Sequence, residues 1–300
     1  MRTTKRFTPA LLERFRQTGR GRGTYQNYIP WHRVGRGDPS SRGRSHLMMW
    51  QGRQIELLSD VEWVASMFSV MVPGCKDLRE QFPLSLAAAD HELGAYDASM
   101  TALQMPGTLQ IAEELGIRHP RVNAEGVSAS WVMSTDLVLT VVGPNCGNTR
   151  LVAVSCKSRG DTAGRRTREM LQIERQYWSV RDVDWLLYTP DLFEESVGLT
   201  LRNSMPWALG DPAPADARAL ATELANVRSG QPLLSTLLHL RETLDDAFDL
   251  AQRAFWQSVW TGLLPLDLRR GWRPHEPLCL LSNPQFLLLN PIASQRSAWN

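Results

Sequence analysis

The chain is poor in several features that would each assign it to a particular class of protein. None of its segments approaches the roughly 18 consecutive apolar residues of a transmembrane helix. Its four cysteines form no C-x-x-C pair, which argues against a zinc site and favours reduced thiols. The N-terminus lacks the apolar stretch of a secretory signal. We therefore expect a cytoplasmic protein with no membrane partner.

Lysine is also scarce, with three lysines against thirty arginines. One of the three, Lys157, ends the apolar run 151–156, where a buried strand would terminate. Lysine offers a compact ammonium that can approach a phosphate or a metal-bound water, whereas arginine presents a planar fork and stays charged. Lys157 is therefore a candidate site residue. The alternative is a lysine that ends a strand and meets solvent.

Asp136 is a second candidate, because it begins the neighbouring apolar run 137–142. Two adjacent strands of a hairpin would bring Asp136 and Lys157 together at one edge of a sheet. An aspartate at the start of a strand is also a common turn residue, so this alternative stays open.

Glu62 is a third candidate, and its local pattern has a structural explanation. Ser59 and Glu62 have the spacing of a capping box, in which the glutamate satisfies a backbone N–H at the start of a helix. However, Glu62, Asp136 and Lys157 follow one another in the order helix, strand, next strand, which fits a nuclease site. Two carboxylates can hold one or two Mg²⁺ ions, while a lysine positions water or neutralises developing charge.

The positive charge is concentrated at the N-terminal end. Residues 1–53 hold twelve Lys or Arg against two acids, interleaved with aromatic residues and glycine. This combination predicts a basic arm that binds nucleic acid in a salt-dependent way. The residues expected to contact DNA are Arg33, Arg36, Arg42 and Arg44, with Trp31 and Trp50 as candidates for base stacking. The alternative is a disordered, solubilising tail.

The periodicity of the remaining sequence predicts an α/β domain whose mixed sheet is flanked by helices. Strands are expected at 77–84, 131–142, 150–157 and 184–189, and helices at 59–72, 109–116 and 166–178. Three later helical stretches, near 215–228, 231–240 and 243–261, precede a possible short hairpin formed by 263–273 and 278–281. These are the parts of a winged-helix-like module. We predict an arm over 1–45, a catalytic domain over 46–205 and a C-terminal domain over 206–300.

Seven stretches of the chain, in the same order, resemble the TnsA family, the endonuclease subunits of Tn-seven-like heteromeric transposases. The stretches are 41–46, 57–62, 78–84, 111–120, 133–136, 154–157 and 171–178. The resemblance implies a restriction-endonuclease-like catalytic domain that uses Mg²⁺. Within it, Glu62, Asp136 and Lys157 fall on the catalytic acid, the metal-binding acid and the catalytic lysine, and Glu174 falls on a further acid that supports the site.

The chain departs from the family two residues before the lysine, where Gln or Glu is usual and Ser155 stands here. Three consequences stay open. The Ser155 hydroxyl could hold a metal through water, the Cys156 carbonyl could take over the coordination, or metal affinity could be weaker.

The resemblance also implies a function and partners. The chain would cut the 5′ strands at transposon ends for cut-and-paste transposition, while TnsB cuts and joins the 3′ ends. Residues beyond 200 would dock TnsB or a TnsC-type ATPase regulator. Two alternatives stay open: a catalytically inactive DNA-binding subunit of the transposition complex, and a stand-alone nuclease of defence or repair.

Overall fold

A computed structural model of the chain describes residues 6–40, 44–101, 103–143, 147–245 and 247–299. The chain divides into two compact units. The first unit comprises residues 1–63, 74–189 and 298–300, and the second comprises residues 64–73 and 190–297. We describe each unit by itself.

The first unit is built on a four-stranded mixed sheet, as the sequence predicts. Its strands are β3 (Cys75–Pro83), β8 (Ser134–Val142), β9 (Thr149–Cys156) and β10 (Asp184–Tyr188), in the order β10-β9-β8-β3. β8 pairs antiparallel with both β3 and β9, whereas β10 runs parallel to β9. The apolar runs 137–142 and 151–156 become the two central strands because both of their faces are covered.

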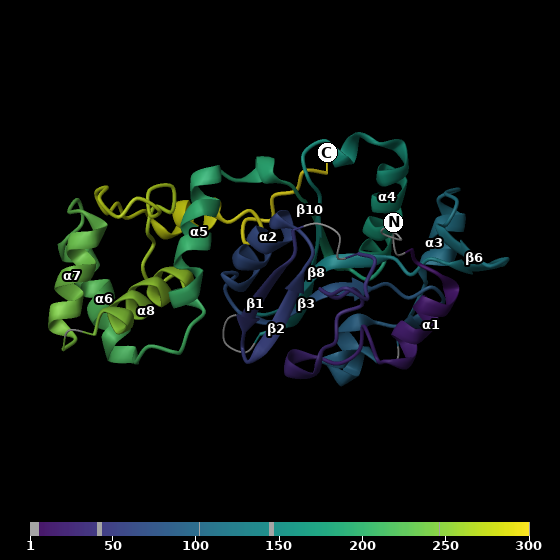
Figure 1. Ribbon diagram of the computed structural model, residues 1–300, viewed down its shortest axis with the longest axis horizontal. Helices are drawn as coiled ribbons and strands as arrows, with labels where there is room; N and C mark the ends of the chain where they lie inside the picture. The colour runs from purple at the N-terminus through teal and green to yellow at the C-terminus, as the bar shows by residue number, and fades with distance from the viewer. Residues whose placement is uncertain (1–5, 41–43, 102, 144–146, 246, 300) are drawn as a thin grey trace. The chain divides into compact units, whose positions relative to one another are not determined.

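Helix α4 (Arg165–Ser179) packs on one face of this sheet (Figure 1). Its buried side chains Ile173, Tyr177 and Trp178 join Val138 and Ala153 of the central strands in one apolar cluster. Helix α3 (Thr108–Glu114) contributes to the same cluster, and helix α2 (Asp60–Val70) begins in the first unit and has its later residues in the second.

The N-terminal segment is part of the first unit and packs there through helix α1 and Trp31. Helix α1 (Pro9–Gln17) buries Leu12 and Phe15 in a cluster with Trp31 and Val132. The Trp31 ring is only 2% exposed, so it is not available to stack on DNA as the sequence suggested. This unit also contains three antiparallel pairs of short strands and several turns of 3-10 helix. The pairs are β1–β2 (His46–Trp50, Arg53–Leu57), β4–β5 (Ala89–Asp90, Gln104–Met105) and β6–β7 (Arg121–Ala124, Val127–Ser130), and the turns include η1 (Tyr25–Asn27) and η5 (Asp161–Ala163).

The segment 85–108, which lies between the predicted strand at 77–84 and the predicted helix at 109–116, has regular structure of its own. It contains the short strands β4 and β5 and two turns of 3-10 helix, η2 (Glu92–Ala95) and η3 (Ala98–Met100). Arg181, just beyond α4, holds this segment through an ion pair with Glu92.

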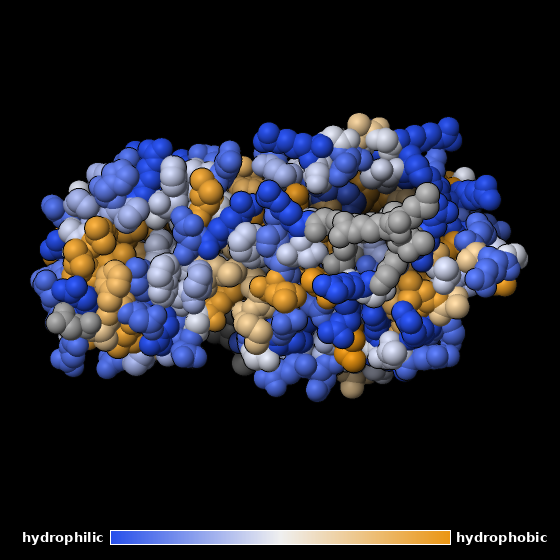
Figure 2. Space-filling model, viewed as in Figure 1, coloured by the Kyte–Doolittle hydropathy of each residue, from blue (hydrophilic) through white to orange (hydrophobic). Residues whose placement is uncertain are grey.

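The second unit is helical. Its helices are α5 (Glu195–Ala208), α6 (Ala215–Val227), α7 (Leu233–Thr243), α8 (Phe248–Trp260) and α9 (Asn283–Leu289). α8 is the central helix, with Phe255 and Val259 fully buried and α5, α6 and α7 packed around it. Figure 1 shows α6, α7 and α8 side by side, and Figure 2 shows apolar surface over α7, where Leu234 and Leu238 are exposed.

The hairpin expected after the third of these helices does not form in the described part of this unit. Only isolated bridges occur there, between Leu266 and Leu280 and between Pro232 and Pro277. Proline lacks the N–H that a ladder of hydrogen bonds needs, and Pro265 precedes the first of these bridges. The winged-helix interpretation is therefore not confirmed. Across the residues described in both units, every helix is too short or too polar to span a membrane.

Candidate active site

Asp136 and Lys157 meet at the ends of the two central strands. β8 pairs with β9 in a register that sets Leu137 opposite Val154. As a result, Lys157 Nζ lies 3.2 Å from Asp136 Oδ2, and the Cys156 backbone N–H donates to the same oxygen at 2.6 Å. Asp136 Oδ1 accepts no hydrogen bond from residues that the structure describes. One oxygen of this carboxylate is therefore open.

Glu62 lies in the first turn of α2, where three donors hold its carboxylate. The Leu58 N–H at 2.8 Å and the Gln81 side-chain amide at 2.9 Å both donate to Oε2, and the Ser59 hydroxyl donates to Oε1 at 3.0 Å. The Glu62 N–H donates to Ser59 Oγ at 3.2 Å, as in a capping box, but the carboxylate accepts from Leu58 N–H instead of Ser59 N–H. A carboxylate has about four lone-pair positions, so one stays open, on Oε1.

The charges of this site act on one another. The pKa of Glu62 is raised to about 7, chiefly by burial and also by the Asp136 carboxylate, in spite of the Leu58 and Ser59 hydrogen bonds and the Lys157 ammonium, which lower it. Glu62 is only 7% exposed, so little water is available to stabilise the charged form of its carboxylate. The acid from α2 therefore lies within electrostatic reach of the acid and the lysine from the sheet.

Lys157 is a cation at neutral pH. Burial alone would lower the pKa of its amine, but the carboxylates of Asp136 and Glu174 outweigh burial and raise the pKa above its usual value. Its Nζ also donates to the Cys156 carbonyl oxygen at 2.9 Å. In this state the side chain can attract and neutralise negative charge but cannot accept a proton.

Ser155 and Glu174 form a buried pair beneath these residues. The Ser155 side chain is fully buried, and its hydroxyl donates to Glu174 Oε1, which also accepts from Thr135 Oγ1 at 2.7 Å. Trp178 in turn donates to Thr135. The Ser155 hydroxyl is thus engaged with Glu174, whose pKa is raised by burial and by Asp136 in spite of the Lys157 charge.

The donor set fits a hard divalent cation in part. Mg²⁺ binds oxygen ligands and usually takes one or two carboxylates together with waters and substrate phosphates. Glu62 Oε1 and Asp136 Oδ1 keep open lone pairs, and the Cys156 carbonyl oxygen accepts a hydrogen bond from Lys157 at 2.9 Å. Within the described ranges, no three His, Cys, Asp or Glu side chains are grouped closely enough to hold a metal alone. Any cation here would therefore depend on water and phosphate for its remaining ligands.

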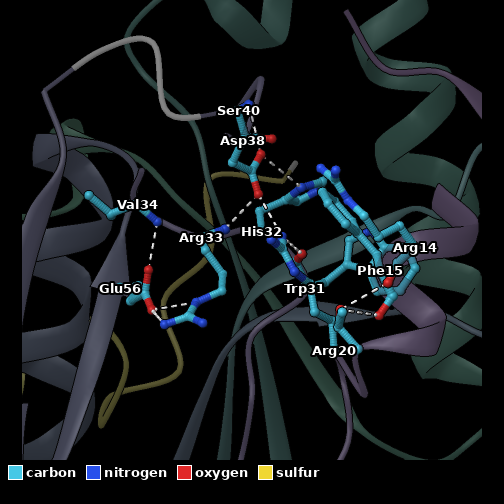
Figure 3. A network of polar contacts seen from close by, with 11 residues as sticks. Arg14, Phe15, Arg20, Trp31, His32, Arg33, Val34, Asp38, Ser40 and Glu56 are labelled. Carbon is cyan, nitrogen blue, oxygen red and sulfur yellow. Dashed lines mark hydrogen bonds and ion pairs between the residues drawn. The ribbon is translucent and has the colours of Figure 1, made fainter. Parts of the chain in front are cut away.

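Arg33, one of the residues expected to contact DNA, is engaged in a polar network of the N-terminal segment (Figure 3). Its guanidinium lies 2.6 Å from Glu56 Oε1, and the Val34 N–H donates to Glu56 Oε2 at 2.6 Å. The Asp38 carboxylate receives Arg20 Nη1 at 2.8 Å and the Arg33 N–H at 2.9 Å. These contacts fix the course of the segment, and the Arg33 side chain is still 49% exposed.

The remaining arginines of that set differ in their surroundings. Arg44 is 84% exposed and forms an ion pair with Asp60 at 3.2 Å, beside the bond of His46 Nε2 to the same carboxylate at 2.7 Å. Arg36 is exposed. Arg42 lies outside the described residues.

Two residues near the site carry no signal in the sequence. Gln81 falls within the stretch of resemblance 78–84 but has no pattern of its own, yet its amide holds Glu62. His32 lies in the basic N-terminal segment, yet it is buried and interacts electrostatically with Asp136. A glutamine inside an apolar strand and a histidine inside a basic segment have no spacing that reveals a partner so distant in the sequence.

Comparison with known proteins agrees with the fold. Residues 73–190 match the family described as TnsA-like endonuclease N terminal, a range that includes Asp136, Lys157 and Glu174 but not Glu62. The chain is also similar to the transposon Tn7 transposition protein TnsA of Escherichia coli, at 28% identity over 250 residues, which cover 81% of this chain and 79% of that protein. The segment in which Asp136 and Lys157 are in contact is therefore similar to the N-terminal domain of TnsA-like endonucleases.

Proposed function

We propose that this chain is the endonuclease subunit of a heteromeric transposase and that it hydrolyses the 5′ strand at each transposon end with the help of Mg²⁺. The observation that carries the proposal is the contact of Lys157 with Asp136, within electrostatic reach of Glu62, in a TnsA-like domain. The similar protein from Escherichia coli is a transposition protein by name, which supports the biological setting.

The residues of the site have separate roles in this proposal. Glu62 and Asp136 would hold one or two Mg²⁺ ions through their open oxygens, with the Cys156 carbonyl as a further ligand. Bound Mg²⁺ supplies Lewis-acid stabilisation of the scissile phosphate. The Lys157 ammonium would attract the phosphate, orient water and neutralise charge as the bond breaks. Glu174 would support the site because its negative charge favours the protonated form of Lys157.

The other parts of the chain would bind DNA and partners. Four arginines of the N-terminal segment, Arg33, Arg36, Arg42 and Arg44, would contact the DNA backbone, and such contacts fix orientation more than sequence. The second unit would dock TnsB or a TnsC-type ATPase regulator. Its exposed apolar side chains on α7, Leu234 and Leu238, support a role in protein contact.

A second candidate function is a catalytically inactive assembly subunit that binds DNA. The observation that favours it is Ser155, whose hydroxyl is buried and engaged with Glu174 at the position where the family usually has Gln or Glu. A weakened cation site would leave a protein that organises the complex without cutting.

The test is strand-specific cleavage of supercoiled donor DNA in the presence of TnsB, TnsC, ATP and Mg²⁺. We expect Lys157→Ala to reduce 5′-strand cleavage by about 100-fold or more, because one preorganised cation at the reacting phosphate is removed. Cleavage of the 3′ strands, made by the partner, should continue. The control is Lys76→Ala, which removes a different, exposed lysine of the same sheet and should leave both cuts unchanged.

The outcomes separate the candidates. Loss of 5′ cuts with 3′ cuts retained identifies this chain as the nuclease of the second strand. Unchanged 5′ cutting by Lys157→Ala together with intact transposition would mean that the chain serves as an assembly subunit. Cleavage by the isolated chain without TnsB and TnsC would instead favour a stand-alone nuclease.

A further inference from the structure

Gln81 has an unusual backbone conformation within a strand. It lies in β3 with φ of 50°, the left-handed region that residues with a side chain rarely adopt. Its neighbours Glu80 and Phe82 pair with Leu137 and Thr135 of β8, so that Gln81 lies opposite Asp136, where no pair forms. Such a conformation is strained and persists only where surrounding contacts impose it.

The contacts of Gln81 tie three segments together. Its backbone carbonyl accepts from the Trp31 N–H at 3.2 Å, and its side-chain Nε2 donates to Glu62 Oε2 at 2.9 Å. The residue is 3% exposed, so the hydrogen bond to Glu62 is shielded from water. Glutamine at this point joins the N-terminal segment, the sheet and the start of α2.

The bond to Glu62 differs from the other two that the carboxylate accepts. Leu58 and Ser59 precede Glu62 by only a few residues and move with the start of α2. Gln81, in contrast, donates from β3, which pairs with the strand that bears Asp136. Of the three donors among the described residues, Gln81 therefore sets the carboxylate of Glu62 relative to that of Asp136.

We propose that Gln81 is a positioning residue for the cation site, held in a left-handed conformation so that its amide fixes the Glu62 carboxylate opposite Asp136. With Oε2 filled by Gln81 and Leu58, the carboxylate cannot rotate freely, and its open lone pair stays on Oε1. Partners that orient a ligand in this way typically contribute about 10- to 100-fold to metal affinity. This inference rests on the proposed function, because it assumes that Glu62 and Asp136 hold a divalent cation.

The test is calorimetric titration of the full, metal-free chain with Mn²⁺ as the probe, beside its thermal midpoint without metal. Gln81→Met keeps the length of the side chain and removes the donor, and Gln81→Gly removes the donor while accepting the left-handed backbone. We expect both variants to lose Mn²⁺ affinity by about 10- to 100-fold. The matched control is Gln51→Met, the same substitution at an exposed left-handed residue (φ 48°) between β1 and β2, which should bind Mn²⁺ as the wild type does.

The outcomes distinguish this inference from the function on which it rests. If the wild type binds Mn²⁺ and Asp136→Asn does not, while a folded Gln81→Gly binds Mn²⁺ with wild-type affinity, the positioning role is wrong and the cation site stands. If the wild type binds no Mn²⁺, or if Asp136→Asn binds as well as the wild type, the cation site itself is overturned. An equal loss of Mn²⁺ affinity in Gln81→Met, which keeps the left-handed strain, and in Gln81→Gly, which relieves it, supports the positioning role and assigns the loss to the missing amide.

Discussion

At the scale of single residues, the first unit contains buried polar groups whose protonation depends on burial. His32 is one of them, with 4% of its surface exposed and its ring stacked on Trp131 at a centroid distance of 5.7 Å. Its Nδ1 has no hydrogen-bond partner among the described residues, since the nearest carboxylate oxygen, of Asp38, is 3.9 Å away. The pKa of His32 is lowered to about 4, chiefly by burial and also by Arg20, against the opposing effects of the Asp38 and Asp136 carboxylates.

This lowered pKa predicts a pH-dependent stability. The unfolded chain binds a proton at His32 below about pH 6.5 and the folded chain does so only near pH 4, so acid favours unfolding over this window. Between pH 7 and pH 5, wild-type stability should therefore fall by about 1–2 kcal/mol more than that of His32→Phe, which keeps the stack on Trp131. Urea denaturation at both pH values measures this.

The comparison with His32→Phe is needed because Glu62 acts in the opposite direction. Its raised pKa makes the folded state bind its proton at higher pH than the unfolded state, which favours folding as the pH falls. Both proteins contain Glu62, so its contribution cancels in the difference between them. An equal loss of stability in the two proteins would show that His32 is protonated in the folded state at pH 5.

Part of this site could be predicted at the residue scale, and part could not. Asp136 and Lys157 end adjacent apolar runs, and strand pairing alone brings such residues together. The capping pattern of Ser59 and Glu62 was also visible, and the structure retains half of it. The amide of Gln81 was not predictable, because its role depends on a left-handed φ that no local pattern announces.

At the scale of elements, apolar periodicity predicted the segments that pack on a single core and missed those that depend on specific polar contacts. The four strands of the sheet and helices α2, α3 and α4 lie near their expected positions. The sequence of segment 85–108 shows no strong apolar periodicity. Its short elements depend mainly on polar contacts with residues outside the segment, such as Arg181. The hairpin expected near 263–281 fails because the prolines of that region cannot donate to a ladder.

Arg181 is the main external support of the segment 85–108. Its side chain is fully buried, with Nε 2.7 Å from Glu92 Oε2 and Nη1 donating to the Pro106 carbonyl at 3.1 Å. Its guanidinium lies 3.5 Å from the centre of the Tyr177 ring, and its own carbonyl oxygen bonds to His91 Nε2 at 2.8 Å. One residue thus connects the end of α4 to both halves of the segment.

We expect Arg181→Met to destabilise the protein by about 3–5 kcal/mol, because it leaves the Glu92 carboxylate buried without its partner. The double variant Arg181→Met/Glu92→Gln should lose less than the sum of the two single changes, since the unpaired charge is removed. Guanidinium denaturation measures all three. The control is Arg165→Met, which breaks an exposed pair with Glu169 and should change stability by less than about 1 kcal/mol. Additive losses in the double variant would contradict the assigned coupling.

At the scale of the whole molecule, the charge of the N-terminal region is partly neutralised within the fold. Several of its arginines form ion pairs with acids, and the pairs are Arg16–Glu13, Arg20–Asp38, Arg33–Glu56, Arg44–Asp60 and Arg53–Glu80. Arg6, Arg14 and Arg22 are exposed and form no ion pair with the described residues. The net positive charge of residues 1–53 therefore overstates the charge available to DNA. In these three arginines, no acid of the described residues competes with DNA phosphate for the guanidinium group.

Arg6 and Arg14 are also grouped, since both line a hollow of about 630 Å³ beside the start of α1. If this hollow receives the DNA backbone, the double variant Arg6→Gln/Arg14→Gln should weaken binding to DNA of any sequence. The negative slope of log affinity against log salt concentration should become shallower by about 2. Fluorescence anisotropy with a short duplex at several salt concentrations measures both. Arg16→Gln, on the same helix but paired with Glu13, should change the slope less. An unchanged slope in the double variant would rule out the hollow and assign the phosphate contacts to other exposed arginines, such as those at 33, 36 and 44, because the slope depends only on the cations that contact phosphate.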